Sequence, residues 1–204
     1  MSLIFDEAES ELIRIALEKE KFHWSSEELK PVRDKIKVFL KSKWAEQCCY
    51  CRSGLVDFHN IDIDIEHILP SSKYKRLAFN ADNLNLSCKR CNMKIKGDNT
   101  DFLVDEDSVE EDFRNPDQYY FIHPNFDVYE DNLKYYNISI DTEKFIKYKQ
   151  LTPKGTYTYG YFKLDKIERN TFNAVQGIED SEHGGETLIP ASVMDALDKL
   201  GKDL

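Results

Sequence analysis

Three short stretches between residues 48 and 98 decide the fold. They read C-C-Y-C at 48–51, D-I-D-I-E-H-I-L-P at 62–70 and N-L-N-L-S-C-K-R-C-N-M-K-I-K-G-D at 83–98. The first and third stretches each contain a Cys-x-x-Cys pair, and 36 residues separate the two pairs. Each pair turns two thiolates to one side of a tight loop, so two pairs complete the tetrahedral sulfur shell that zinc prefers. The predicted zinc ligands are Cys48, Cys51, Cys88 and Cys91.

The predicted zinc site is structural, because four cysteine ligands leave the ion no open position for a reactant. A redox function would require one Cys-x-x-Cys pair beside a βαβ pattern, and this chain has two pairs. Metal binding would then contribute to the folding free energy of the whole stretch. Cys49 lies between two predicted ligands, and we expect it to be a free thiol.

The middle stretch places an acid next to a histidine at the end of a strand. Residues 61–65 alternate strictly between isoleucine and aspartate, which predicts a half-buried strand with its acids, Asp64 and Glu66 among them, on one side. Carboxylates bind hard divalent cations, and a histidine titrates close enough to neutrality to take a proton from water. Glu66 and His67 are therefore candidates for metal binding and general base catalysis. Three alternatives stay open: Glu66 is only a surface carboxylate, Asp64 is the ligand or supports the ligand, or His67 is only a packing residue.

A second strand and a short helix are expected to follow. Residues 84–87 return toward Cys88 as a strand, and a helix starts at Cys91 and ends at Gly97-Asp98. The order within the stretch is therefore strand, strand, helix. Residues 71–83 form the connecting loop, with basic side chains exposed on it.

The rest of the chain is expected to supply helices before this stretch and strands after it. Apolar residues recur at helical spacing over 6–20, and a second helix starts near 24–28, carries Pro31 in its first turn and runs to residue 43. Residues 104–117 have the composition of a surface loop. The elements predicted beyond it are strands at 119–122, 133–140 and 156–164, a turn at 153–155 that follows 145–151, a helix at 164–172, a loop at 177–187 and a helix at 193–200.

Composition indicates a globular protein whose basic residues gather around the cysteines. The 204 residues are 41% hydrophobic and 32% charged, with a net charge of −10. Residues 35–100 nevertheless hold 12 lysines and arginines against 7 acids, and the remainder carries a net charge of −15. Phosphate binding needs such a basic region, while the acidic flanks would limit unspecific DNA binding or face a basic partner. A merely solvated acidic surface is the alternative for the flanks.

The N-terminal residues carry acids where a signal peptide carries bases, and no long apolar run follows them. We therefore expect a cytoplasmic protein with no membrane contact. In a reducing compartment, five cysteines favour metal ligands over disulfides.

Residues 48–98 resemble the HNH endonucleases, also called ββα-metal or treble-clef nucleases. Glu66-His67 matches the acid–histidine form of the first HNH element, Asn83 the middle asparagine, and Asn92 the third element. Paired Cys-x-x-Cys motifs are widespread in that family. The resemblance covers about a quarter of the chain. It implies an α+β fold with a zinc-stapled ββα-metal core at 48–103, an N-terminal helical region at 1–47 and a C-terminal β-rich lobe with a terminal helix at 104–204.

The resemblance also implies a role for each matched residue. His67 would be the general base, and Asn83 would orient it by hydrogen bonds. Glu66 and Asn92 would bind a catalytic Mg²⁺ or Mn²⁺, which would stabilise the pentavalent phosphate and the leaving 3′ oxygen and so yield a 5′-phosphate. An asparagine stands where other members carry a second metal-binding histidine, which favours these two metals over a strongly bound transition metal. The expected nucleic-acid contacts are Lys75, Arg76, Lys94 and Lys96.

These expectations describe a metal-dependent endonuclease that hydrolyses DNA in a bacterial defence or restriction context. The chain loosely resembles the stand-alone HNH subunits that work beside an ATPase in Septu-like defence, so an ATPase or another defence subunit is an expected partner. The alternative is a zinc-dependent module that binds nucleic acid or protein without cleaving. The intact set of four motif residues weighs against that alternative.

Overall fold

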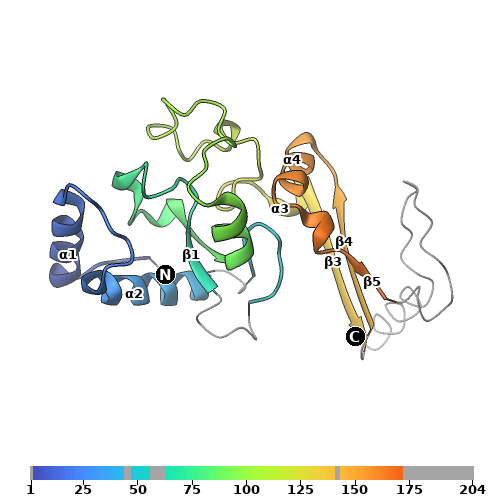
Figure 1. Ribbon diagram of the computed structural model, residues 1–204, viewed down its shortest axis with the longest axis horizontal. Helices are drawn as coiled ribbons and strands as arrows, with labels where there is room; N and C mark the ends of the chain where they lie inside the picture. The colour runs from blue at the N-terminus through green and yellow to red at the C-terminus, as the bar shows by residue number, and fades with distance from the viewer. Residues whose placement is uncertain (1, 44–46, 56–62, 141–142, 172–204) are drawn as a thin grey trace.

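The computed structural model describes residues 2–43, 47–55, 63–140 and 143–171, and these residues form an α+β protein (Figure 1). The helices α1 and α2 lie at one end of the molecule, and a three-stranded sheet with two helices lies at the other end. A two-stranded hairpin stands between them and carries the cysteine-rich stretch. The predicted loop at 177–187 and helix at 193–200 lie outside the described residues.

Both predicted N-terminal helices are confirmed. α1 spans Glu7–Glu18 and begins with a capping box, in which the Asp6 side chain accepts from the backbone of Glu9 and the Glu9 side chain accepts from the backbone of Asp6. α2 spans Lys30–Lys43 and follows the short 3₁₀ helix η1, Glu27–Leu29. Pro31 is the second residue of α2, where its missing N–H leaves no hydrogen bond unmade.

The central hairpin joins β1, Ile63–His67, to β2, Leu84–Cys88, and both strands were predicted. The strands are antiparallel, and regular pairing continues to the end of β1, where His67 lies opposite Leu84. The hairpin loop contains two 3₁₀ helices, η3 at Lys75–Leu77 and η4 at Ala81–Asn83. A π-helix, η5, spans Arg90–Lys96 and ends at Gly97, whose φ of 51° lies in the left-handed region that favours glycine.

The second sheet has the order β3-β4-β5 and is antiparallel throughout. The predicted strand at 133–140 is confirmed, and residues 145–151, which were given no assignment, lie almost entirely in a second strand. Residues 119–122 are not a strand, because only Tyr119 pairs, in an isolated bridge with Leu103. The elements of this part are η6 at Pro116–Gln118, α3 at Tyr129–Asn132, β3 at Leu133–Ile140, β4 at Glu143–Gln150, α4 at Pro153–Tyr161, η7 at Leu164–Lys166 and β5 at Arg169–Asn170.

The strand predicted at 156–164 is wrong, because the aromatic run forms most of the helix α4. Thr152 caps this helix by accepting from the backbone of Gly155 at 3.1 Å, and a proline occupies its first turn. Gly155 lies so close to Asn132 that a Cβ atom would be 1.9 Å from the Asn132 carbonyl oxygen. Because the run is helical, its aromatic side chains recur at helical spacing, and the rings of Tyr157 and Tyr161 stack one turn apart.

The helix predicted at 164–172 is also wrong. The segment instead forms the short η7 and then β5, an edge strand of the sheet that pairs with β4. Thr171 continues this pairing, because its hydroxyl accepts from Lys144 N at 2.8 Å and its backbone N–H donates to Lys144 O at 3.0 Å. The backbone groups at the end of this segment are therefore satisfied by pairing with β4 and not by helical hydrogen bonds.

One hydrophobic core runs through the three expected regions. Its buried members come from α2, from the hairpin, from the loop after η5 and from the segment after α4; examples are Ile36, Leu40, Leu84, Leu86, Phe102, Phe121, Phe162 and Leu164. The second sheet and its helices therefore pack against the same core as the cysteine-rich stretch.

Candidate metal centre and histidine site

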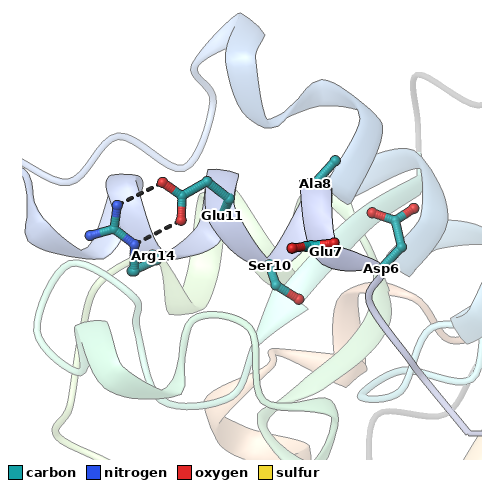
Figure 2. Close-up of a pocket in the computed structure, with 6 residues that line it drawn as sticks. All are labelled: Asp6, Glu7, Ala8, Ser10, Glu11 and Arg14. Carbon is teal, nitrogen blue, oxygen red and sulfur yellow. Dashed lines mark hydrogen bonds and ion pairs between the residues drawn. The ribbon is translucent and has the colours of Figure 1, made fainter.

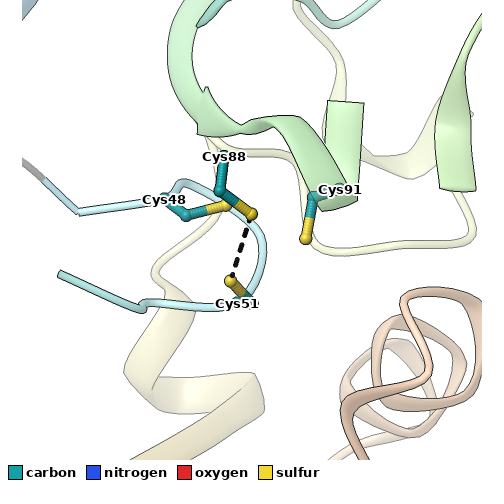
Figure 3. A group of neighbouring side chains, drawn as sticks. All are labelled: Cys48, Cys51, Cys88 and Cys91. Atoms are coloured by element: carbon teal, nitrogen blue, oxygen red, sulfur yellow. Dashed lines mark hydrogen bonds between the residues drawn. The ribbon is translucent and has the colours of Figure 1, made fainter. Parts of the chain in front are cut away.

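The four predicted zinc ligands come together from two parts of the chain (Figure 3). The Sγ atoms of Cys48, Cys51, Cys88 and Cys91 all lie within 4.8 Å of one another, and Cys51 Sγ is 3.9 Å from Cys88 Sγ. The first pair lies in a tight loop that Gln47 and Gly54 close by bridging, with Arg52 at a φ of 57°. The second pair lies where β2 ends and η5 begins. Four cysteines at these distances could hold a metal ion.

Contacts among the sulfur atoms lower the pKa of Cys51 and of Cys88, and four thiolates held this closely would need a cation to offset their charge. Burial raises the pKa of Cys48, so this thiol ionises only if positive charge compensates for the lost solvation. Arg90 places Nη1 3.9 Å from Cys91 Sγ, but one guanidinium cannot neutralise four thiolates. Cys49 is buried outside the cluster, and burial raises its pKa, which agrees with the expected free thiol.

Tyrosines of the second sheet region hold the first cysteine loop. Tyr129 donates its hydroxyl to Tyr50 O at 3.0 Å, and Tyr148 donates its hydroxyl to Cys51 O at 2.5 Å. A cavity of about 300 Å³ beside the cluster is lined in part by Cys51, Cys88 and Ile167. Sequence reasoning missed these tyrosines, because nothing local marks which tyrosine will reach a distant carbonyl.

His67 lies against the N-terminal part of the molecule. Its ring packs edge-to-face on Trp24, with ring centroids 4.4 Å apart, and its Nε2 is 2.9 Å from Ala78 O. A carbonyl oxygen can only accept, so Nε2 carries the proton and Nδ1 keeps its lone pair. Burial lowers the pKa of His67 to about 4, and the imidazole is therefore neutral at pH 7.

Asn83 fixes the loop that carries the hydrogen-bond partner of His67. Its Oδ1 accepts from Leu69 N at 2.8 Å, and its Nδ2 donates to Leu69 O at 3.0 Å and to Leu77 O at 3.3 Å. Leu77 directly precedes Ala78. The buried carboxamide therefore ties both ends of the loop together beside the histidine.

Glu66 points to the other face of the hairpin, because successive side chains of a strand alternate. Its Oε1 is 2.9 Å from Lys96 Nζ and accepts from the Tyr50 hydroxyl at 3.0 Å, and its Oε2 accepts from Ser87 Oγ at 3.4 Å. Glu66 is 0% exposed and Lys96 is 1% exposed. Lys96 was expected to contact phosphate, but the structure places its ammonium in the interior, where it neutralises Glu66.

Asn92 pairs with Asp64 rather than with Glu66. Asn92 Nδ2 is 3.3 Å from Asp64 Oδ2, and both residues are partly exposed. Burial raises the pKa of Asp64, while the hydrogen bond from Asn92 and the charges of Lys89 and Lys37 lower it. Among the described residues of this face, Asp64 and Asn92 are oxygen-bearing side chains that are partly open to solvent.

The other three predicted nucleic-acid contacts differ in how far their side chains are exposed. Arg76 and Lys94 are exposed, whereas Lys75 is partly buried and donates to Lys19 O at 2.8 Å. The structure thus leaves Arg76 and Lys94 open to a ligand and engages Lys75 with α1.

A shallow hollow on α1 carries no comparable chemistry (Figure 2). Two of its charged members already pair, since Arg14 donates from Nε and Nη2 to the two carboxylate oxygens of Glu11 at 2.8 and 2.6 Å. The residues that line it are Asp6, Glu7, Ala8, Ser10, Glu11 and Arg14.

The fold and the site define an α+β protein with a four-cysteine centre that could hold a metal ion. The chain is similar to the Septu protein PtuB of Bacillus thuringiensis, at 41% identity over 59 residues. That alignment covers 29% of this chain and 23% of the relative, so the chain matches less than a quarter of PtuB. No family model matches the chain, and no solved structure matches it. None of the helices in the described ranges is long and apolar enough to cross a membrane.

Proposed function

We propose that this protein is a metal-dependent HNH endonuclease that hydrolyses DNA phosphodiester bonds in a bacterial anti-phage defence system. The observation that carries the proposal is the histidine at the end of β1. His67 is neutral, its Nε2 is fixed on Ala78 O, and its Nδ1 has a lone pair. That is the state that a general base needs at neutral pH. The similarity to PtuB supports the defence context.

In the proposed reaction, Nδ1 of His67 takes a proton from a water molecule as the water oxygen bonds to the phosphorus. The bond between phosphorus and the 3′ oxygen breaks, the 3′ oxygen takes a proton from solvent, and a 5′-phosphate remains. Asn83 and the loop that it ties keep the imidazole in place during this transfer. His67 is 9% exposed and Glu66 is 0% exposed; the proposed reaction requires the water and the phosphate to reach Nδ1 of His67 through this small exposed part.

The four cysteines fit a structural Zn²⁺, because sulfur ligands at these separations suit a closed tetrahedral shell. For a catalytic Mg²⁺ or Mn²⁺, the partly exposed Asp64 and Asn92 offer oxygen atoms, whereas Glu66 does not fit because a buried ammonium already neutralises it. Such an ion, when bound, would supply positive charge near a DNA phosphate, on the face of β1 that carries Glu66 and not on the face that carries His67.

The proposed partners are DNA and an ATPase or another subunit of the defence system. Arg76 and Lys94 are exposed near the hairpin and are the proposed DNA-backbone contacts. A second subunit would explain why a small nuclease carries the acidic flanks noted in its sequence.

Plasmid cleavage tests the proposal. Zinc-loaded protein with Mn²⁺ or Mg²⁺ should nick or linearise supercoiled plasmid, and His67→Ala should slow cleavage by roughly 10²- to 10⁴-fold. His23→Ala is the matched control, since it removes an exposed imidazole close to the same tryptophan. Thermal unfolding of each variant shows that it is folded. Cleavage by His67→Ala at the wild-type rate would contradict the assignment of the base.

A zinc-dependent module that binds nucleic acid or protein without cleaving is the second candidate. The ion pair between Glu66 and Lys96 favours it, because one expected metal ligand is already neutralised in the interior. This candidate requires that no divalent metal supports cleavage under any condition, while binding of DNA or of a partner protein remains.

A further inference from the structure

We propose that the ammonium group of Lys96 is a permanent counterion of Glu66 and that it prevents divalent metal ions from binding this carboxylate. The inference deepens the proposed nuclease function and rests on it for its consequence. It excludes Glu66 as a protein ligand of a catalytic metal.

The first support is that the ammonium is fully coordinated. A lysine ammonium has three N–H donors. Lys96 Nζ is 2.9 Å from Glu66 Oε1, 2.8 Å from His67 O and 3.3 Å from Gly97 O. The nearby Phe102 ring, with its centroid 5.8 Å from Nζ, adds a cation–π contact. Lys96 is therefore anchored as a cation in an oxygen-lined position.

The second support is that Glu66 has no route to a hydrated metal in this arrangement. Besides the ammonium, the Tyr50 hydroxyl occupies Oε1 and the Ser87 hydroxyl occupies Oε2, at 3.0 and 3.4 Å. Mg²⁺ and Mn²⁺ keep several water molecules when they bind carboxylates, and these waters need space beside the ligand. A divalent ion at Glu66 would also face the positive charge of Lys96 at close range.

The arrangement has a consequence for the histidine. Lys96 bonds both to the backbone of His67 and to the side chain of the preceding residue, Glu66. It thereby holds the end of β1 against the C-terminal end of η5. Lys96 is then a positioning residue for His67.

Binding of Mn²⁺ to the zinc-loaded protein, followed by electron paramagnetic resonance without DNA, tests the inference. Lys96→Met removes the charge and leaves the carboxylate of Glu66 without its counterion, so the variant should bind Mn²⁺ roughly tenfold more tightly than the wild type or better. The gain should disappear in the double variant Glu66→Gln/Lys96→Met. Lys149→Met, which removes an exposed charge from β4, should bind like the wild type. Equal Mn²⁺ affinities of Lys96→Met and the wild type would overturn the inference.

Lys96→Met leaves a buried carboxylate without its counterion, so it can fail to fold in metal-free buffer. In that case the variant is refolded with and without Mn²⁺ beside the double variant. The inference requires that Mn²⁺ raises the recovery of Lys96→Met and not that of the double variant; equal recovery with and without Mn²⁺ overturns it. Neither readout involves DNA, so failure here is distinct from failure of plasmid cleavage.

Discussion

The two faces of strand β1 differ in whether the titratable side chain on each face has a counterion. On one face, Glu66 is matched by Lys96 and by two hydroxyl groups, and the surroundings are tied to the cysteine centre through Tyr50. On the other face, His67 is neutral and has an aromatic ring and one backbone carbonyl as its main contacts. The first face has the features of a closed structural support, and the second has the features of a reactive group held in one orientation.

The comparison shows what strand geometry does to an acid–histidine pair. Neighbours in a regular strand point to opposite faces, and pairing of His67 with Leu84 keeps β1 regular to its end. Glu66 and His67 therefore cannot serve one ligand from the same side while this pairing holds. The two faces can be tested separately, in order of the expected effect.

The largest effect is expected from breaking the cysteine centre. Cys91→Ser removes one proposed zinc ligand, and loss of the metal should unfold the hairpin and the core that it shares with the second sheet. Zinc content should fall to near zero, and far-ultraviolet circular dichroism should show loss of cooperative thermal unfolding. Cys49→Ala, in the same loop but outside the cluster, should keep both zinc and cooperative unfolding. A folded, zinc-free Cys91→Ser protein would contradict the expected dependence on metal.

Lowering the pH should reduce the free energy of unfolding by an intermediate amount, through protonation of His67 in the unfolded chain. The folded pKa of His67, about 4, lies below the ordinary value of 6.5, so the unfolded chain binds a proton that the folded chain does not. The stabilisation is complete above about pH 6.5 and is lost as the pH falls toward 4. At pH 5 the wild type should lose about 2 kcal/mol from this group.

Urea unfolding at pH 7.5 and at pH 5, with excess zinc, measures this loss. His67→Gln should lose less stability than the wild type over the same interval, because its side chain does not titrate. His123 is a second buried histidine, whose pKa burial lowers to about 3, and its contribution is common to both proteins. Equal losses in the wild type and His67→Gln would show that His67 is not held neutral.

The smallest effect is expected at the tyrosine contacts to the cysteine loop. Tyr148→Phe removes the hydroxyl that donates to Cys51 O at 2.5 Å and should cost about 1 kcal/mol of unfolding free energy. Tyr120→Phe is the matched control, since Tyr120 is 47% exposed, and it should have little effect. If the two variants were equally stable, Tyr148 would not support the metal centre.

The sequence identified the elements whose signals are local. The two Cys-x-x-Cys pairs, the alternating residues of β1 and the capping residues of α1 each predict structure from a few neighbouring positions. The aromatic run after Pro153 was misread as a strand because strand propensity outweighed the cap at Thr152 and the helical spacing of the buried residues. Gly155 is tolerated in that helix because Asn132 leaves no space for a side chain, which is a tertiary contact.

The candidate site was only partly predictable for a similar reason. Motif spacing named Glu66, His67 and Asn92, but the partner of each depends on residues distant in sequence. Lys96 turns inward to Glu66, and Asn92 reaches Asp64 across 28 positions. A sequence motif specifies which residues are present and does not specify which face of a strand each one serves.

The most direct test of the central claim is the protonation state of His67. Nitrogen-15 NMR of the zinc-loaded protein, with the His67 signals assigned by their absence in His67→Gln, reports which ring nitrogen carries the proton. The account predicts a neutral ring protonated at Nε2 at pH 7 that titrates near pH 4. A ring protonated at Nδ1, or a doubly protonated ring at pH 6, would contradict it.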